Sequence, residues 1–122
     1  MNDRKALIRA FKEKIPPKGV FCIKNNESGR IFLASSLNLH GIFSTQKMAL
    51  NNNIHMNGDL QSDWNTFGAE AFTFEILEEM KFKEDGTTNY IEELEILEAI
   101  WVDKFEPIAE KTYNKSAKIR TV

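Results

Sequence analysis

Two short runs of alternating residues predict a β-hairpin near the start of the chain. β-Branched and aromatic residues fill residues 20–25 and 30–35, and a loop that contains Gly29 separates the two runs. Successive side chains of a strand point to opposite faces, so Phe21 and Phe32 each occupy one defined face of a strand. We therefore expect the two phenyl rings to be neighbours on the hairpin.

Apolar residues at helical spacing predict a helix on either side of this hairpin. A leading helix is expected behind Asn2-Asp3 and before Pro16-Pro17, with the stripe Leu7, Ile8, Phe11 and Ile15. A second helix is expected to begin near Ser36 or Asn38, with the stripe Leu39, Ile42, Phe43, Gln46 and Leu50. The polar side chain of Gln46 lies within an otherwise apolar stripe.

The remainder of the chain predicts a short helix, a strand and a long helix. Asp59 is expected to cap the short helix, which Gly68 ends. Residues 71–77 alternate as a strand with inward side chains at Phe72, Phe74 and Ile76. The long helix is expected over residues 90–105, with an apolar arc formed by Tyr90, Ile91, Leu94, Leu97, Trp101 and Phe105.

Glu98 projects from this apolar arc, between Ile91 and Phe105. A buried carboxylate needs a hydrogen-bonding partner, a counter-charge or a metal ion. A carboxylate within an apolar arc conflicts with the hydrophobic pattern, and such a conflict favours a functional role for Glu98. Glu93 lies near the other edge of the same arc, so Glu98 is not the one carboxylate that conflicts with the pattern.

Composition restricts the class of protein. The chain has 122 residues, 42% of them hydrophobic and 28% charged, which is typical of a single soluble globular domain. Its one cysteine, Cys22, excludes an internal disulfide framework and is consistent with a reducing compartment. There is no apolar run long enough to span a bilayer and no signal-like segment, so we expect a cytoplasmic protein.

The net charge of −2 conceals an asymmetry along the chain. Residues 1–50 hold nine Lys or Arg against three Asp or Glu, whereas residues 51–122 hold seven against fifteen. A basic half of this kind could face phosphates, or it could be a solvated surface balanced by the acidic half. Charge alone leaves both interpretations open.

Colinear motifs point to one family. In chain order they are Gly19-Val20-Phe21, Phe32-Leu33-Ala34, Ser35-Ser36-Leu37-Asn38-Leu39, His55, Leu60-Gln61, Trp64-Asn65-Thr66-Phe67-Gly68, the strand residues 72–78, Glu98 with Trp101-Val102, and Thr112-Tyr113-Asn114. This set resembles the phage and intron-encoded branch of the GIY-YIG endonucleases, whose first two strands carry the tripeptides of the name. The resemblance implies an α/β (α+β) fold with a small, mostly antiparallel three-stranded sheet flanked by helices, here with an extra N-terminal helix.

The resemblance also implies site positions, most of which have lost the family chemistry. The family places two tyrosines beside the scissile phosphate, an arginine and a histidine on the next helix, and a glutamate that holds one divalent metal ion. The matching positions are Phe21, Phe32, Ile42, Gln46 and the candidate Mg²⁺ or Mn²⁺ ligand Glu98, together with Asn114. Loss of one electrostatic donor commonly lowers a rate by ~10²–10³. Several are lost here, so efficient hydrolysis is not expected.

Three hypotheses follow for function. The first is a protein that binds nucleic acid, DNA rather than RNA, and whose phosphodiesterase activity is lost or much reduced. Its candidate nucleic-acid contacts are Lys24, Arg30, Lys47 and His55. The second is an active Mg²⁺-dependent DNA endonuclease, and the third is a protein–protein interaction module that keeps the fold. The expected organisation is a helical extension over residues 1–18, a nuclease-like domain over 19–114 and a basic tail over 115–122.

Overall fold

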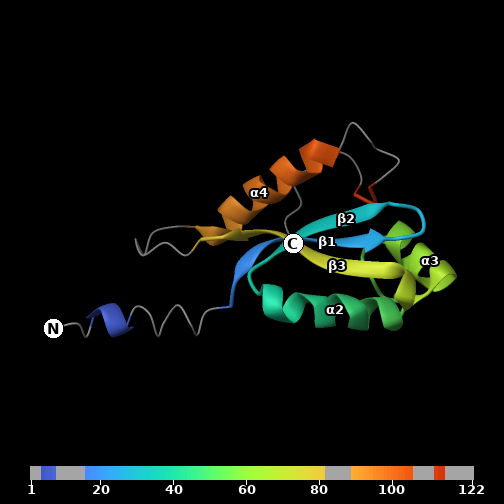
Figure 1. The fold of residues 1–122 in the computed structure, drawn as a ribbon, viewed down its shortest axis with the longest axis horizontal. Coiled ribbons are helices and arrows are strands. Elements are labelled where there is room, and N and C mark those ends of the chain that lie inside the picture. The colour runs from blue at the N-terminus through green and yellow to red at the C-terminus, as the bar shows by residue number, and fades with distance from the viewer. Residues whose placement is uncertain (1–3, 8–15, 82–88, 106–111, 115–122) are drawn as a thin grey trace.

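The computed structural model describes residues 4–7, 16–81, 89–105 and 112–114. A three-stranded sheet with the order β2-β1-β3 forms its centre, and both strand pairs are antiparallel. The elements in chain order are β1 (Lys18–Asn25), β2 (Ile31–Ser36), α2 (Leu39–Asn51), α3 (Gly58–Phe67), the 3₁₀ turn η1 (Ala69–Ala71), β3 (Phe72–Met80) and α4 (Tyr90–Phe105). The α+β architecture expected from the sequence is confirmed (Figure 1).

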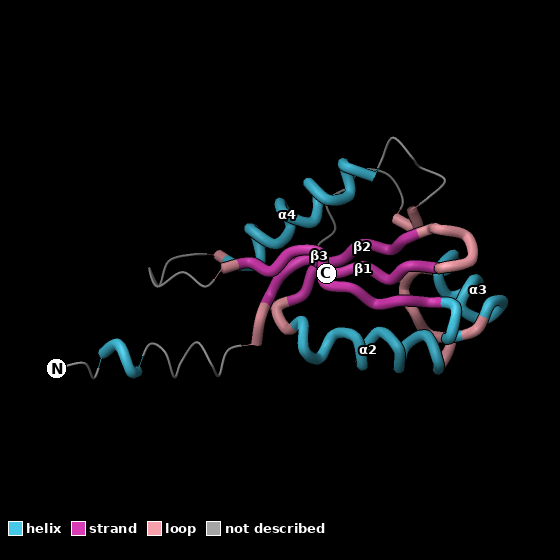
Figure 2. The backbone as a smooth tube through the Cα atoms, in the orientation of Figure 1, coloured by secondary structure: helices cyan, strands magenta, loops and turns pink. Residues whose placement is uncertain are grey.

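The helices cover the two faces of the sheet. Helix α2 runs along one face, with α3 beyond the end of the sheet, and α4 lies on the opposite side near β2 (Figures 1 and 2). Because successive side chains of the hairpin point to opposite faces of the sheet, the buried residues form two clusters, one on each face. Phe21 and Phe32 belong to the apolar cluster on the α2 side, whereas Cys22 and Leu33 belong to the cluster that packs against α4. The predicted facing of the hairpin side chains is therefore confirmed.

The third strand extends further than its sequence pattern suggested. It continues to Met80, and a bulge opposite the Val20–Phe21 step inserts Leu77 as an extra residue. Leu77 packs against the cluster on the α4 side. The prediction that Ile76 points into the core was wrong, because this side chain is 47% exposed. β3 is an edge strand, and α2 packs mainly over the central strand β1.

Helix caps explain where α2 and α3 begin. Asn38 caps α2, as expected, through its side-chain oxygen, which accepts a hydrogen bond from the Gly41 N–H. The predicted cap Asp59 was wrong. Asn57 performs this role for α3, and its Oδ1 accepts from the N–H of Leu60 at 3.0 Å. Asp59 instead lies in the first turn, where a carboxylate interacts favourably with the helix dipole.

Some residues of the predicted apolar stripes are exposed rather than buried. Ile91 was placed in the buried arc of α4 but is 53% exposed, whereas Leu94 and Glu98 are buried. Residues 4–7 are helical and Leu7 is 68% exposed; the other apolar residues of the predicted leading stripe, and the side chain of Phe105, lie outside the described residues. None of the described helices has the length and apolar character that crossing a membrane requires.

Candidate functional site

A small, narrow cavity of about 40 Å³ lies beside β2. Because β2 is an edge strand, side chains from α2 on one face and α4 on the other meet around it. The cavity brings together five of the site positions that the sequence singled out. Its full lining is Phe21, Phe32, Leu33, Ala34, Ser35, Ile42, Gln46, Met56 and Glu98.

The two phenyl rings form a closed wall of this cavity. Phe21 is 1% and Phe32 is 2% exposed. They are diagonal neighbours, because Phe21 pairs with Ala34 across the two strands. The Phe21 ring makes an edge contact with Phe43, and the Phe32 ring makes one with His55 at 5.3 Å between centroids. Both rings are therefore held by packing, and neither offers a proton donor or acceptor.

Glu98 is the charged side chain in the cavity lining and is 3% exposed. It comes from the third turn of α4 and approaches β2 where Ser35 follows Ala34 in the strand. The Ser35 hydroxyl donates a hydrogen bond to Glu98 Oε1 at 3.0 Å. The carboxylate thus points inward, as the sequence predicted, and part of its hydrogen-bonding capacity is used within the protein.

On the opposite wall, the polar side chain of Gln46 is bonded to His55. The His55 Nδ1 accepts a hydrogen bond from the Asn57 N–H at 3.0 Å. The same ring contacts Gln46 Oε1 through Nε2, so the network assigns the proton to Nε2, which donates to the amide oxygen. The backbone N–H of His55 also donates a hydrogen bond to Gln61 Oε1. Both ring nitrogens of His55 are thereby engaged in positioning the loop before α3.

The fold has counterparts among solved structures. The sequence matches no model of a known protein family and no curated protein. The catalytic domain of the homing endonuclease I-TevI aligns with a TM-score of 0.66 at 21% identity, over 81% of this chain and 98% of that domain. A mutant of the catalytic domain of intron endonuclease I-TevI aligns with a TM-score of 0.63 at 22% identity, over 84% of this chain and 96% of that one.

This chain has the fold of the I-TevI catalytic domain. The expected GIY-YIG resemblance is confirmed for the fold. Within the fold, the cavity lies where the first two strands, α2 and α4 converge. Ser35 and Met56, which the sequence did not assign to the site, complete its lining. Strand alternation placed Ser35 on the face opposite Ala34, but no local signal indicated that α4 would bring Glu98 to it.

Asn114 does not line the cavity. Its side chain acts as a strand extension instead, because Oδ1 accepts from the Leu33 N–H at 2.8 Å and Nδ2 donates to the Leu33 carbonyl at 2.7 Å. Just before it, Thr112 forms a parallel bridge with Ile31. Residues 112–114 therefore pair with the outer edge of β2, and β2 is the strand that contributes residues 32–35 to the cavity lining.

Tyr113 holds this covering segment in the core. Its hydroxyl donates to Asp63 Oδ2 at 2.7 Å and accepts from Asn25 Nδ2 at 3.1 Å. Burial, with a further contribution from the hydrogen bond to Asp63, raises the pKa of Tyr113 to about 12. In the sequence Tyr113 is part of the closing motif Thr112-Tyr113-Asn114, and no local pattern indicates this long-range network.

The candidate nucleic-acid contacts do not converge on the cavity. Lys24 is exposed on β1, and Lys47 is exposed on α2 with its Nζ 5.0 Å from the centre of the Phe74 ring. Arg30 stacks over Tyr113 and lies 3.6 Å from the Asp63 carboxylate. Among the four candidates, His55 is the one that contacts cavity-lining side chains.

The described lining of the cavity offers a divalent metal ion one carboxylate, that of Glu98. Among the described residues, no group of three or more His, Cys, Asp or Glu side chains could hold a metal ion together. Mg²⁺ requires six oxygen ligands and usually keeps several waters. The space beside Glu98 is about 40 Å³. In this closed arrangement Glu98 is a hydrogen-bond acceptor for Ser35.

Proposed function

We propose that this protein is a nucleic-acid-binding domain built on a nuclease fold, in which phosphodiester hydrolysis has been lost. The observation that carries the proposal is the narrow cavity at the convergence of β1, β2, α2 and α4, where Phe21, Phe32 and Ile42 supply phenyl and alkyl groups and Glu98 is the one charged side chain of the described lining. We place the domain at residues 19–114. DNA is the proposed ligand, and the named solved structures with this fold are endonuclease domains.

Hydrolysis needs groups that this cavity lacks. Negative charge develops on the phosphoryl oxygens and must meet preorganised donors or cations, and a base must activate water. Phe21 and Phe32 supply neither a proton acceptor nor a donor, and Ile42 supplies no charge. Gln46 and His55 are bonded to each other. The side chains at the family site positions therefore support packing rather than acid–base chemistry.

Access to the cavity supports the same proposal. A scissile phosphate remains attached to two sugars, and a cavity of about 40 Å³ offers it little space. The metal-dependent alternative would require the cavity to widen around Glu98, whose Oε1 accepts a hydrogen bond from Ser35. We propose that the site stabilises the fold, while nucleic acid binds at exposed lysines outside it.

Binding is tested by fluorescence anisotropy with labelled duplex, branched and single-stranded DNA and a duplex RNA over a series of salt concentrations. Phosphate contacts make the logarithm of the binding constant fall linearly with the logarithm of the salt concentration. Lys24→Ala and Lys47→Ala are each expected to reduce that slope by about 1 if the lysine contacts a phosphate. Lys104→Ala, at an exposed lysine of α4 near Trp101, is the matched control.

The result that would overturn the proposed binding is absence of any anisotropy change with every nucleic acid at low salt. Recovery of a protein partner in that situation would favour the interaction-module hypothesis instead. Preference for the duplex RNA would correct the ligand class while leaving phosphate binding in place.

Loss of hydrolysis is tested separately with supercoiled plasmid in Mg²⁺ or Mn²⁺. The wild type and Glu98→Gln are expected to leave the plasmid equally intact, because no step depends on the carboxylate. Nicking by the wild type that disappears in Glu98→Gln would show a working metal-dependent nuclease and refute the proposal. Glu98→Gln keeps an acceptor for the Ser35 hydroxyl, so its fold can be verified by circular dichroism.

A further inference from the structure

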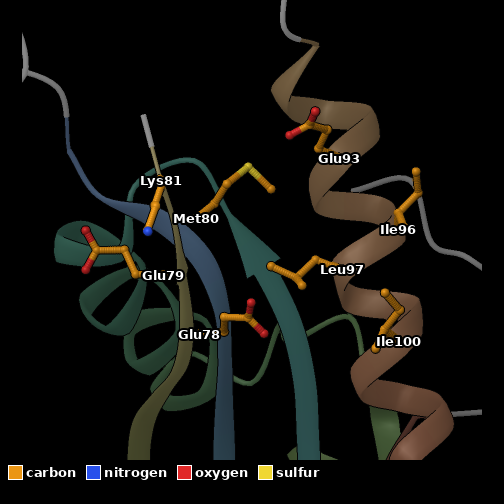
Figure 3. Close-up of a pocket in the computed structure, with 8 residues that line it drawn as sticks. All are labelled: Glu78, Glu79, Met80, Lys81, Glu93, Ile96, Leu97 and Ile100. Atoms are coloured by element: carbon orange, nitrogen blue, oxygen red, sulfur yellow. The ribbon is translucent and has the colours of Figure 1, made fainter. Parts of the chain in front are cut away.

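An open apolar groove lies between the end of β3 and α4, away from the candidate site. Its volume is about 420 Å³, and its lining is Glu78, Glu79, Met80, Lys81, Glu93, Ile96, Leu97 and Ile100. Figure 3 shows Met80 and Leu97 pointing toward one another across the gap, with Ile96 and Ile100 along α4. Ile96 is 57% and Ile100 is 47% exposed, so the described part of the chain leaves large apolar side chains uncovered here.

The groove combines this apolar floor with an acidic border. Three glutamates and one lysine are the charged residues of its lining. Glu78 points into the groove and Glu93 lies at one end of it in Figure 3. A segment that fits such a surface carries apolar side chains at helical spacing, together with an excess of basic residues.

A segment of the chain with this chemistry lies before β1. Residues 1–15 hold five Lys or Arg against two Asp or Glu, and their apolar stripe is Leu7, Ile8, Phe11 and Ile15. In a helix, Leu7 and Ile15 would be about 12 Å apart, close to the roughly 10 Å from Glu93 to Ile100 along α4. The apolar stripe and the groove therefore match in length as well as in charge.

The position of the described N-terminal turn favours docking on another molecule. Residues 4–7 are helical and exposed, and Figure 1 shows this turn standing clear of the sheet and its helices. The Pro17 carbonyl accepts a hydrogen bond from the Leu39 N–H at 2.8 Å, which anchors the chain at the start of α2. Two consecutive prolines restrict the backbone just before this anchor, so they disfavour a sharp reversal onto the chain's own α4.

We propose that the groove between β3 and α4 receives the basic N-terminal segment of a second copy of this chain. The exchange is reciprocal, so each copy gives one segment and accepts one around a two-fold axis. Apolar contact of the Leu7 stripe with Ile96, Leu97 and Ile100 holds the two copies together, and the glutamates of the border select the basic segment. The assembly depends on neither DNA binding nor loss of hydrolysis.

Sedimentation velocity of the full chain over a concentration series tests the proposal. The wild type is expected to form a dimer. Ile96→Lys places a charge in the groove and is expected to weaken dimerisation at least about tenfold, as is Leu7→Asp in the docking segment. Ile54→Lys, at a side chain that is 73% exposed outside the groove, is the matched control and keeps the wild-type dimer.

Mixing the two weakened variants separates exchange between copies from docking within one copy. In an equimolar mixture, the intact segment of Ile96→Lys meets the intact groove of Leu7→Asp, so one of the two contacts forms and a mixed dimer is expected. A wild type that stays monomeric at all concentrations overturns the proposal. So does a dimer that neither variant weakens, or weakened variants that form no mixed dimer. Leu7 is 68% exposed, so Leu7→Asp remains informative if Ile96→Lys disturbs α4.

Discussion

Replacing Tyr113 with Phe removes one hydroxyl from the buried network that holds residues 112–114 against β2. That hydroxyl donates to the Asp63 carboxylate and accepts from Asn25, and Tyr113 and Asn25 are 1% and 0% exposed. A hydrogen bond to a charged group contributes about 1.5–3 kcal/mol, and a buried donor that loses its partner adds a desolvation cost. We expect Tyr113→Phe to lower the free energy of unfolding at pH 7 by about 2–3 kcal/mol.

The same hydroxyl predicts a pH dependence. Burial first, and then the bond to Asp63, raises the pKa of Tyr113 from 10.0 to about 12 in the folded protein. The folded state therefore holds this proton more tightly than the unfolded state does. The stability linked to Tyr113 is fully present below pH 10 and is lost as the pH rises from 10 to 12, by about 2–3 kcal/mol in total.

Urea unfolding of the wild type and Tyr113→Phe at pH 7, and at steps from pH 9 to 12, measures both effects. Other groups that titrate in this range do so in both proteins, so the difference between the two curves isolates Tyr113. We expect this difference to be largest below pH 10 and to shrink by pH 12. Tyr90→Phe, at a half-buried tyrosine on α4, is the matched control. A difference that is below about 0.5 kcal/mol at pH 7, or constant from pH 9 to 12, would refute the reasoning.

Three further predictions concern the strands around the site. Gly19→Ala places a Cβ against the Glu78 carbonyl oxygen, closer than van der Waals contact allows, so thermal unfolding should show a loss of about 3 kcal/mol or more. A near-wild-type melting temperature would contradict this contact. Burial is the main cause that raises the pKa of the Cys22 thiol to about 11. We expect this thiol to react with an aromatic disulfide at pH 8 only after unfolding, because the thiolate is the reactive form. Rapid labelling of the native protein would contradict its burial. Asn114→Ala removes both hydrogen bonds to the Leu33 backbone and should cost about 1–3 kcal/mol in urea unfolding, whereas an unchanged midpoint would exclude the strand-extension role.

Local patterns predicted the elements of the fold well where one face of an element is buried by its neighbours. The hairpin faces, the Asn38 cap and the inward direction of Glu98 all agree with the structure. The patterns failed where a neighbour decides the outcome. Ile76 alternates like a core residue but lies on an edge strand and is 47% exposed. Asn57 and Asp59 are both capping residues by type, and only the backbone path of the preceding loop selects Asn57.

The sequence by itself determined which chemical groups this protein has at the candidate site positions: phenyl rings without hydroxyls, an aliphatic side chain, an amide and one carboxylate. Only the tertiary structure decided how these groups are used. It closes them into a space of about 40 Å³, bonds Gln46 to His55 and gives Glu98 the Ser35 hydroxyl as a donor. Residue identity is a property of each position, whereas enclosure and hydrogen-bond partners arise from segments that are distant in the sequence and meet only when the sheet and its helices pack.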